Sequence, residues 1–181
     1  DDGTRIILDP YEPDCYNGAL GYATITDPAD IVLSSHDHGD HNWVKGIKGN
    51  PIIIKDSGNY TPKGIHIKGI STFHDKCHGK ERGSNTIFVI ELDKLRVCHL
   101  GDLGHELTPS DASIIGPIDI LFPPIGGFFT IDAHETHNII NRLQPKLVIP
   151  MHYKTEKCNF KIGTLEPFLT SRKFKKLDQM E

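Results

Sequence analysis

The chain has 181 residues and 37% apolar side chains, which is enough for one soluble domain with a buried core. Its 20 basic and 24 acidic residues give a formal net charge of −4 and form no basic stripe, which argues against a nucleic-acid-binding surface. The longest apolar stretch, Ile118 to Phe129, is interrupted by prolines and glycines, so no segment is predicted to span a membrane.

Short β-rich runs recur along the chain and mostly end in Gly, Pro, Asp or His. Their β-branched and apolar side chains, and their length of a few residues, are typical of strands. The predicted strands are Arg5–Leu8, Ile31–Ser34, Pro51–Ile54, Gly64–Ser71, Thr86–Leu92, Leu95–Leu100, Ile118–Phe122 and Leu147–Pro150.

Helical patterns are fewer and lie mainly in the second half of the chain. Thr108 supplies an N-cap, and a proline follows it, for a helix that runs to about Ile115. Asp132 similarly caps a helix over residues 133–143. Thr164 is the N-cap of a third predicted helix.

The order of these elements predicts a single domain over residues 1–181. Hairpins early in the chain and strand-helix alternation later indicate the α/β (α+β) class, with mixed sheets whose outer faces are covered by helices. Asp1, Asp2 and Gly3 lead at once into a strand, like a hairpin turn whose first strand is absent, so we expect the native chain to begin further upstream. Four widely spaced cysteines without a CxxC pair predict reduced thiols and a cytoplasmic protein.

The segment Ser34–Asn42 places four potential metal ligands directly after an apolar strand. These ligands are His36, His38, Asp40 and His41. A strand end fixes the loop and leaves its side chains exposed, so the first two can hold one ion while the last two turn to a neighbouring ion. Neutral imidazoles and a carboxylate suit Zn²⁺ or a similar first-row ion, and no thiolate is positioned to compete. A polar surface loop without a metal is the weaker interpretation of four ligands in this order.

Three other strand ends supply further ligand types. His74 and Asp75 follow one predicted strand, Asp102 follows another, and His152 follows the last. Groups at the rim of a sheet commonly build a site together. The segment after His74 also contains His78, so either imidazole can be the ligand, and the strand-end position favours His74.

Together these residues resemble the metallo-β-lactamase superfamily, and within it the small zinc-dependent hydrolase branch that includes ascorbate phosphate lactonase-like hydrolases. The resemblance extends through nearly the whole chain in the segments Leu8–Pro10, Cys98–His105, Pro124–Thr130 and Ile149–Thr155. It implies a four-layer αββα sandwich of two mixed β-sheets, with metals at one edge of the sheets. The family also places a first strand and the start of a second before Leu8, and we expect this part of the fold to be missing from the given sequence.

The family pattern also implies a place for each ligand around two divalent ions. One ion takes His36, His38 and His74; the other takes Asp40, His41 and His152; Asp102 bridges them. The implied metal is Zn²⁺, with Mn²⁺ or Fe²⁺ also suitable. Asp9 resembles the family's buried aspartate that orients the metal loop, and the alternative for Asp9 is a turn residue before a proline.

Two dications that share a water lower its pKa toward neutrality, which produces hydroxide, and one of them also polarises the substrate oxygen. The sequence therefore predicts a hydrolase acting on a small-molecule ester, lactone, amide or phosphodiester. Asp40 and Asp102 are the predicted catalytic residues, and Asp40 combines ligation with proton transfer.

Further residues are predicted to surround the metals. His105, Tyr153 and Lys154 are candidate donors to the substrate, although Lys154 is equally expected as a solvated lysine. His78 and His99 are expected beside the site rather than as ligands. The segment Gly126–Phe129 follows a strand and is expected either as a pocket wall or as packing under the sheet edge.

Three alternative functions share the same motif. The first motif of di-iron oxidoreductases on this scaffold resembles His-x-Glu-x-Asp-His, whereas this sequence has His38 in place of the glutamate. A nuclease is disfavoured by the acidic net charge. A non-catalytic binding module stabilised by metal is disfavoured because structural zinc sites are usually closed and cysteine-rich.

Overall fold

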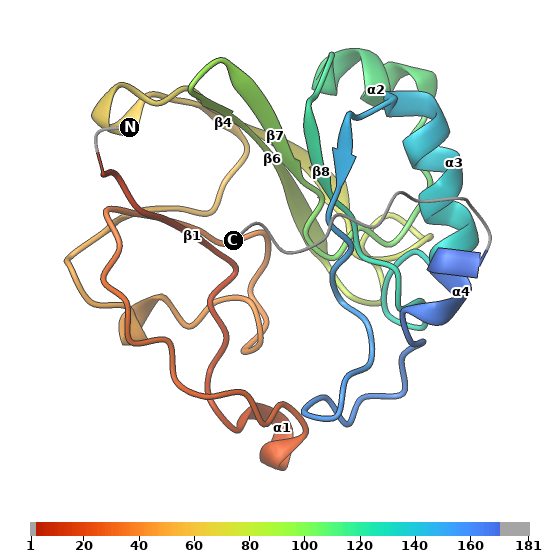
Figure 1. The fold of residues 1–181 in the computed structure, drawn as a ribbon, viewed down its shortest axis with the longest axis horizontal. Coiled ribbons are helices and arrows are strands. Elements are labelled where there is room, and N and C mark those ends of the chain that lie inside the picture. Colours follow the sequence, from red (N-terminus) through yellow and green to blue (C-terminus); the bar gives the residue numbers. More distant parts are fainter. Residues whose placement is uncertain (1–2, 171–181) are drawn as a thin grey trace, which may run out of the picture.

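Two β-sheets and a group of helices make up the fold in a computed structural model that describes residues 3–170 (Figure 1). The strands are β1 Ile6–Leu8, β2 Ile31–Leu33, β3 Ile52–Ile54, β4 Gly58–Tyr60, β5 Ile67–Phe73, β6 Ser84–Leu92, β7 Leu95–His99, β8 Ile120–Phe122 and β9 Leu147–Val148. The helices are α1 Cys15–Gly18, α2 Pro109–Ile115, α3 Ala133–Leu143 and α4 Glu166–Thr170, with 3₁₀ turns η1 Val44–Gly46 and η2 Pro62–Gly64.

The smaller sheet has the order β1-β2-β3 and the larger sheet runs in sequence order from β4 to β9. The larger sheet is mixed, because β4 to β7 pair antiparallel while β7, β8 and β9 pair parallel. The prediction that both sheets are mixed is wrong for the described part of the smaller sheet, where both strand pairs are parallel. Long connections after β1 and β2 return the chain to the same end of the sheet, as parallel pairing requires.

The alternation of side chains along the strands explains how the two sheets pack. In β6, Phe88 and Ile90 point toward the smaller sheet and contact Ile31 and Leu33 of β2 in one buried cluster. The intervening side chains of β6 point the other way, into a cluster with α2, α3 and α4 that includes Phe168. Those helices therefore stand on the outer face of the larger sheet, with β1 on the other side of that sheet (Figure 1).

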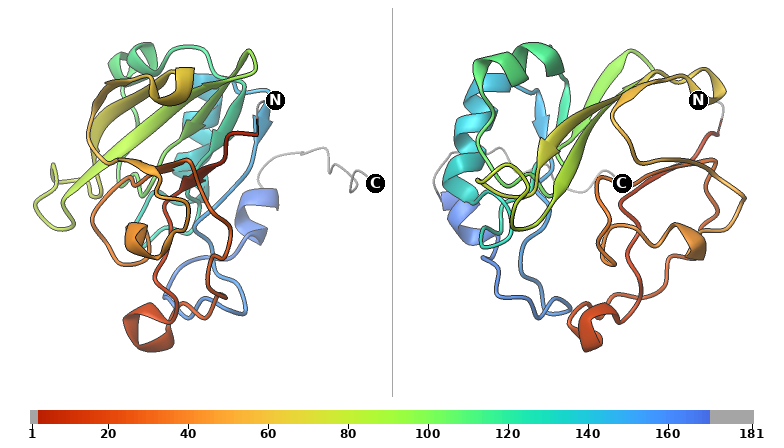
Figure 2. Two further views of the ribbon diagram at one scale, coloured as in Figure 1. Left: turned by 90° about the vertical axis from the view of Figure 1, so that its left-hand side faces the viewer. Right: turned by 180° about the vertical axis from the view of Figure 1, so that it is seen from behind.

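The outer face of the smaller sheet has a different cover. Val32 of β2 packs there with Ala29 and Ile47, and with the half-buried Val44 of η1. In the described residues this layer is a loop with a 3₁₀ turn rather than the α-helix implied by a four-layer sandwich (Figure 2). Gly46 keeps the turn tight, because a Cβ atom at this position would lie 2.1 Å from Nε1 of the Trp43 ring.

The two longer helices begin at the predicted residues. The Thr108 hydroxyl accepts a hydrogen bond from the Asp111 backbone N–H at 3.1 Å, and the Asp132 carboxylate accepts one from Glu135 at 2.9 Å. Two elements, α1 and β4, were not predicted from the sequence. The first is a short turn in which Tyr16 and a neighbour adopt left-handed backbone angles, and the second has only three residues. None of the helices in residues 3–170 has the length and apolar content needed to cross a membrane.

Candidate metal centre

The strand directions explain why distant ligand residues meet at one edge. β5 and β7 both pair antiparallel with β6, so they run in the same direction, and β8 and β9 run parallel to β7. Their carboxyl ends therefore lie at a common edge, which brings His74, Asp102 and His152 together. The loop after β2 reaches the same edge from the smaller sheet.

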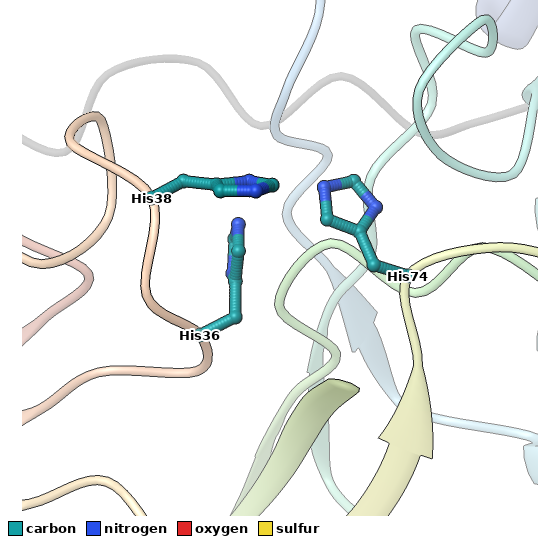
Figure 3. A group of neighbouring side chains, drawn as sticks. All are labelled: His36, His38 and His74. Atoms are coloured by element: carbon teal, nitrogen blue, oxygen red, sulfur yellow. The ribbon is translucent and has the colours of Figure 1, made fainter. Parts of the chain in front are cut away.

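The structure brings all seven predicted metal ligands into overlapping groups whose ligand atoms lie within 4.8 Å of one another. The groups are His36, His38 and His74; Asp40, His41 and His152; and His36, His41 and Asp102. Figure 3 shows the first group, in which two imidazoles from the loop after β2 face a third at the end of β5. The first two groups match the predicted ligand sets of the two ions, and the third connects them.

The Asp102 carboxylate lies at the centre of these groups. Its Oδ2 atom is 3.2 Å from Nε2 of both His74 and His152, and 3.9 Å from Nε2 of His36. Its Oδ1 atom is 3.4 Å from Nε2 of His41. Two ligands of a tetrahedral ion with bonds of roughly 2.0–2.2 Å are separated by about 3.4 Å. The donor atoms are thus spaced as metal ligands are.

Several buried side-chain nitrogen and oxygen atoms have no hydrogen-bond partner in the described structure, including His36 Nε2 and Asp102 Oδ1. Leaving such atoms without a partner is costly, and a bound cation would satisfy them. Burial would by itself raise the pKa of Asp102, but the nearby His152 and His41 lower it well below the usual range. Asp102, the predicted bridging ligand, is therefore an ionised carboxylate.

The two central imidazoles differ in their protonation. Burial, reinforced by the charge of His41, lowers the pKa of His36 to about 3 and keeps its ring neutral, as a metal ligand must be. Burial would also lower the pKa of His41, but the Asp102 and Asp9 carboxylates outweigh it and raise the pKa to about 10. Without a bound metal, the two carboxylates therefore favour the protonated form of His41.

The Asp9 carboxylate lies behind the metal loop and accepts four hydrogen bonds. The Ser35 backbone N–H donates at 2.6 Å and its hydroxyl at 2.7 Å, while His41 Nδ1 lies at 3.1 Å and His99 Nε2 at 2.8 Å. Fixing Nδ1 of His41 directs its Nε2 atom toward Asp102, as a residue that orients a metal ligand must do. His99 lies beside the site, as the sequence predicts.

The remaining predicted site residues are less close to the metal groups. The His78 ring packs on Phe73 at 5.3 Å and belongs to none of the metal-binding groups among the described residues, so the geometry favours His74. His105 accepts a backbone hydrogen bond from Phe73 at 3.4 Å. Tyr153 lines a cavity of about 340 Å³ that also contacts Asp40, His41 and His152. The Lys154 side chain is exposed, which favours its interpretation as a solvated lysine.

A second cavity, of about 390 Å³, opens directly onto the metal groups. Beside five of the predicted metal ligands it is lined by Tyr16, Arg82, Phe129 and Phe160. Phe129 fulfils the pocket-wall expectation for residues 126–129. The other three were not predicted from the sequence, because none belongs to a motif and each reaches the cavity only through the fold.

Gly104 is required for the close approach of two loops at the site. Its backbone N–H donates to the Phe73 carbonyl at 3.0 Å, and a Cβ atom at this position would lie 2.2 Å from the carbonyl carbon of His74. We expect Gly104→Ala to lower the free energy of unfolding by about 1–3 kcal/mol, because backbone atoms must shift. Urea denaturation measures this change. Gly21→Ala is the control, since its nearest heavy atom would lie at 3.6 Å, and an equal loss in both variants contradicts the explanation.

Comparison with known proteins agrees with this geometry. Residues 1–152 match the Beta-lactamase superfamily domain family. A metal-dependent hydrolase of Thermococcus onnurineus is 30% identical, over 83% of this chain and 78% of that protein. A crystal structure of a candidate Zn-dependent hydrolase of the metallo-beta-lactamase superfamily from Thermotoga maritima is 38% identical with a TM-score of 0.78, and the match covers 96% of this chain and 79% of that chain.

A metallo hydrolase from Ignicoccus hospitalis, at 23% identity and a TM-score of 0.69 over 94% of this chain and 83% of that one, shares the fold. These matches confirm the fold class and the family inferred from the motif. They also confirm that the chain is an enzyme that depends on metal. The chain belongs to the Beta-lactamase superfamily domain family and is a metal-dependent hydrolase of the metallo-β-lactamase superfamily.

Proposed function

We propose that this hydrolase uses two divalent ions, with Zn²⁺ as the first candidate, to cleave an ester, lactone, amide or phosphodiester bond in a small molecule. The observation that carries the proposal is the position of Asp102, whose carboxylate lies 3.2–3.9 Å from four imidazole nitrogens between two sets of three ligands. Mn²⁺ and Fe²⁺ fit the same nitrogen and oxygen donors. We further propose that the protein is a single domain and is located in the cytoplasm.

Each residue has a defined part in this proposal. His36, His38 and His74 hold one ion, and Asp40, His41 and His152 hold the other, with Asp102 shared. When bound, the two ions supply an activated water and a Lewis acid for the substrate oxygen. The Asp40 carboxylate lies at the edge of the cavity, where its Oδ1 atom accepts a hydrogen bond from the Tyr16 hydroxyl at 3.3 Å. This position at the cavity edge supports the proposed second role of Asp40, which is to accept a proton from the nucleophilic water.

The alternative functions fit this site less well. Purely imidazole ligands at His36 and His38 favour zinc over the glutamate-containing set of a di-iron oxidoreductase. The net charge of −4 does not favour a nuclease. A cavity of about 390 Å³ beside the ligands is unlike the closed sites of metal-stabilised modules.

Metal removal and return test the proposal. We expect chelated protein to lose hydrolysis of model lactones, aryl esters, acyl amides and bis-aryl phosphodiesters, and stoichiometric Zn²⁺ to restore turnover of at least one class while raising the melting temperature. Calorimetry and a plate assay of each substrate class measure the two effects. A rise in melting temperature without turnover of any class supports the binding module instead. Stoichiometric iron and a visible absorption band in freshly purified protein support redox chemistry.

A further inference from the structure

The cavity beside the metal groups has a wall that the hydrolytic chemistry does not explain. In this wall the Phe160 ring contacts two other rings edge-on: its centroid lies 5.6 Å from that of Tyr16 and 6.0 Å from that of Phe129. Tyr16 comes from the turn α1 near the start of the chain, while the two phenylalanines come from loops in its second half. The three rings add an aromatic surface to the cavity that the predicted metal ligands also line, of the kind that holds the body of a small molecule.

Arg82 is the one arginine or lysine that lines this cavity among the described residues. Its guanidinium carbon lies 5.8 Å from the centre of the Phe129 ring. Its ion pair with Glu81 measures 3.5 Å and involves a carboxylate that is 65% exposed, so the pair is weak. A guanidinium has five N–H donors in a planar fork, which leaves donors for a ligand in the cavity.

The backbone of Arg82 is fixed relative to the metal ligands. Its N–H donates to Asp75 Oδ2 at 2.9 Å, and the same carboxylate accepts backbone hydrogen bonds from Cys77, Gly79 and Glu81 at 2.8–3.0 Å. Asp75 is buried and directly follows the ligand His74. The loop that carries Arg82 is therefore held next to the metal site. This restricts how far the guanidinium can lie from the bond that is cleaved.

The charge of the site favours an anion. With both ions bound, their four positive charges would exceed the two negative charges of Asp40 and Asp102, and Arg82 adds a positive charge to the cavity lining. A planar guanidinium pairs with a carboxylate or a phosphate through two parallel hydrogen bonds. An anionic group in the cavity would add a bidentate partner to the weak ion pair that Arg82 makes with Glu81.

We propose that Arg82 binds an anionic group of the substrate, a carboxylate or a phosphate, while the rings of Tyr16, Phe129 and Phe160 contact the apolar body of the substrate. This inference rests on the proposed function. The substrate class is then a small anionic ester, lactone, amide or phosphodiester. The volume of about 390 Å³ limits it to a compact molecule. Arg82 sets specificity and takes no part in activating water.

The first experiment compares two esters of equal length with Zn²⁺-loaded protein: the mono-4-nitrophenyl ester of glutaric acid, which is anionic, and 4-nitrophenyl valerate, which is neutral. We expect Arg82→Gln to lower kcat/KM about 10-fold for the anionic ester and less than about 2-fold for the neutral one, mainly through KM. Arg82→Lys should recover part of the loss. Lys80→Gln removes the same charge from the same loop outside this cavity and should change neither value.

The second experiment measures binding rather than turnover. Isothermal titration calorimetry with glutarate and with propyl phosphate gives the dissociation constant of each anion for the Zn²⁺-loaded wild type and variants. An increase of about 10-fold in Arg82→Gln supports the inference. A loss for one ligand alone identifies which anionic group Arg82 recognises. Unchanged dissociation constants for both ligands in Arg82→Gln, or an equal change in Lys80→Gln, overturn it.

The two proposals fail in different ways. If the wild type hydrolyses no substrate but Arg82→Gln still weakens anion binding, the hydrolytic proposal fails and the anion site stands. If the wild type is a metal-dependent esterase whose preference between the two esters survives Arg82→Gln, the anion site fails and the hydrolytic proposal stands.

Discussion

Asp102→Asn is expected to abolish metal-dependent turnover, with a loss of about 10³-fold or more in kcat/KM. In the proposed site, Asp102 would be a ligand shared by two dications, and its negative charge would reduce their mutual repulsion. Asparagine keeps the size of the side chain but loses the negative charge and one of the two oxygens that face His41 and His74. The bound metal should fall from two ions per chain to one or none.

Kinetics with the best substrate of the screen and elemental analysis of dialysed protein measure both effects. Asp93→Asn is the matched control, because it makes the same chemical change in an exposed turn between β6 and β7, at a backbone φ of 47° that asparagine tolerates. Circular dichroism should show the same fold in both variants. Full activity in Asp102→Asn, or retention of two ions, removes this residue from the bridging position.

The metal loop and the large elements were predictable from sequence because their signals are local. The four ligands after β2 lie within six residues, and strand ends pointed to His74, Asp102 and His152 without any knowledge of the fold. Both ends of helix α3 were predicted correctly, because its capping box and its apolar face are formed by residues that lie close together in the sequence. Features that depend on a few neighbouring residues can therefore be predicted from the sequence.

The cavity wall was not predictable in the same way. Tyr16, Arg82 and Phe160 come from three loops far apart in sequence, and aromatic or charged residues in loops are common without any function. Only the fold brings them to one cavity. The parallel pairing of the smaller sheet was missed for a related reason, because strand direction depends on the path of long connections rather than on the strand residues.

Asp9 was predicted to orient the metal loop, and its contacts give that role a measurable consequence. Asp9→Asn is expected to weaken metal affinity about 10–100-fold, as loss of a partner behind a metal ligand typically does. The native carboxylate accepts hydrogen bonds from the backbone N–H and the hydroxyl of Ser35, and from the rings of His41 and His99. An amide offers one acceptor oxygen, and its NH₂ group would face at least one of these donors, so the ligand His41 loses its fixed orientation.

Excess metal separates this effect from the loss of a ligand. Asp9 touches no substrate or metal in the proposed mechanism, so saturating Zn²⁺ should restore most of kcat in Asp9→Asn, whereas it cannot restore a missing bridge in Asp102→Asn. Competition with a chromophoric chelator gives the affinity, and activity against free Zn²⁺ gives the recovery, with Asp93→Asn as the common control. Unchanged metal affinity in Asp9→Asn shows that its hydrogen bonds serve only the fold. A loss of kcat that persists at saturating metal places Asp9 in the reaction itself.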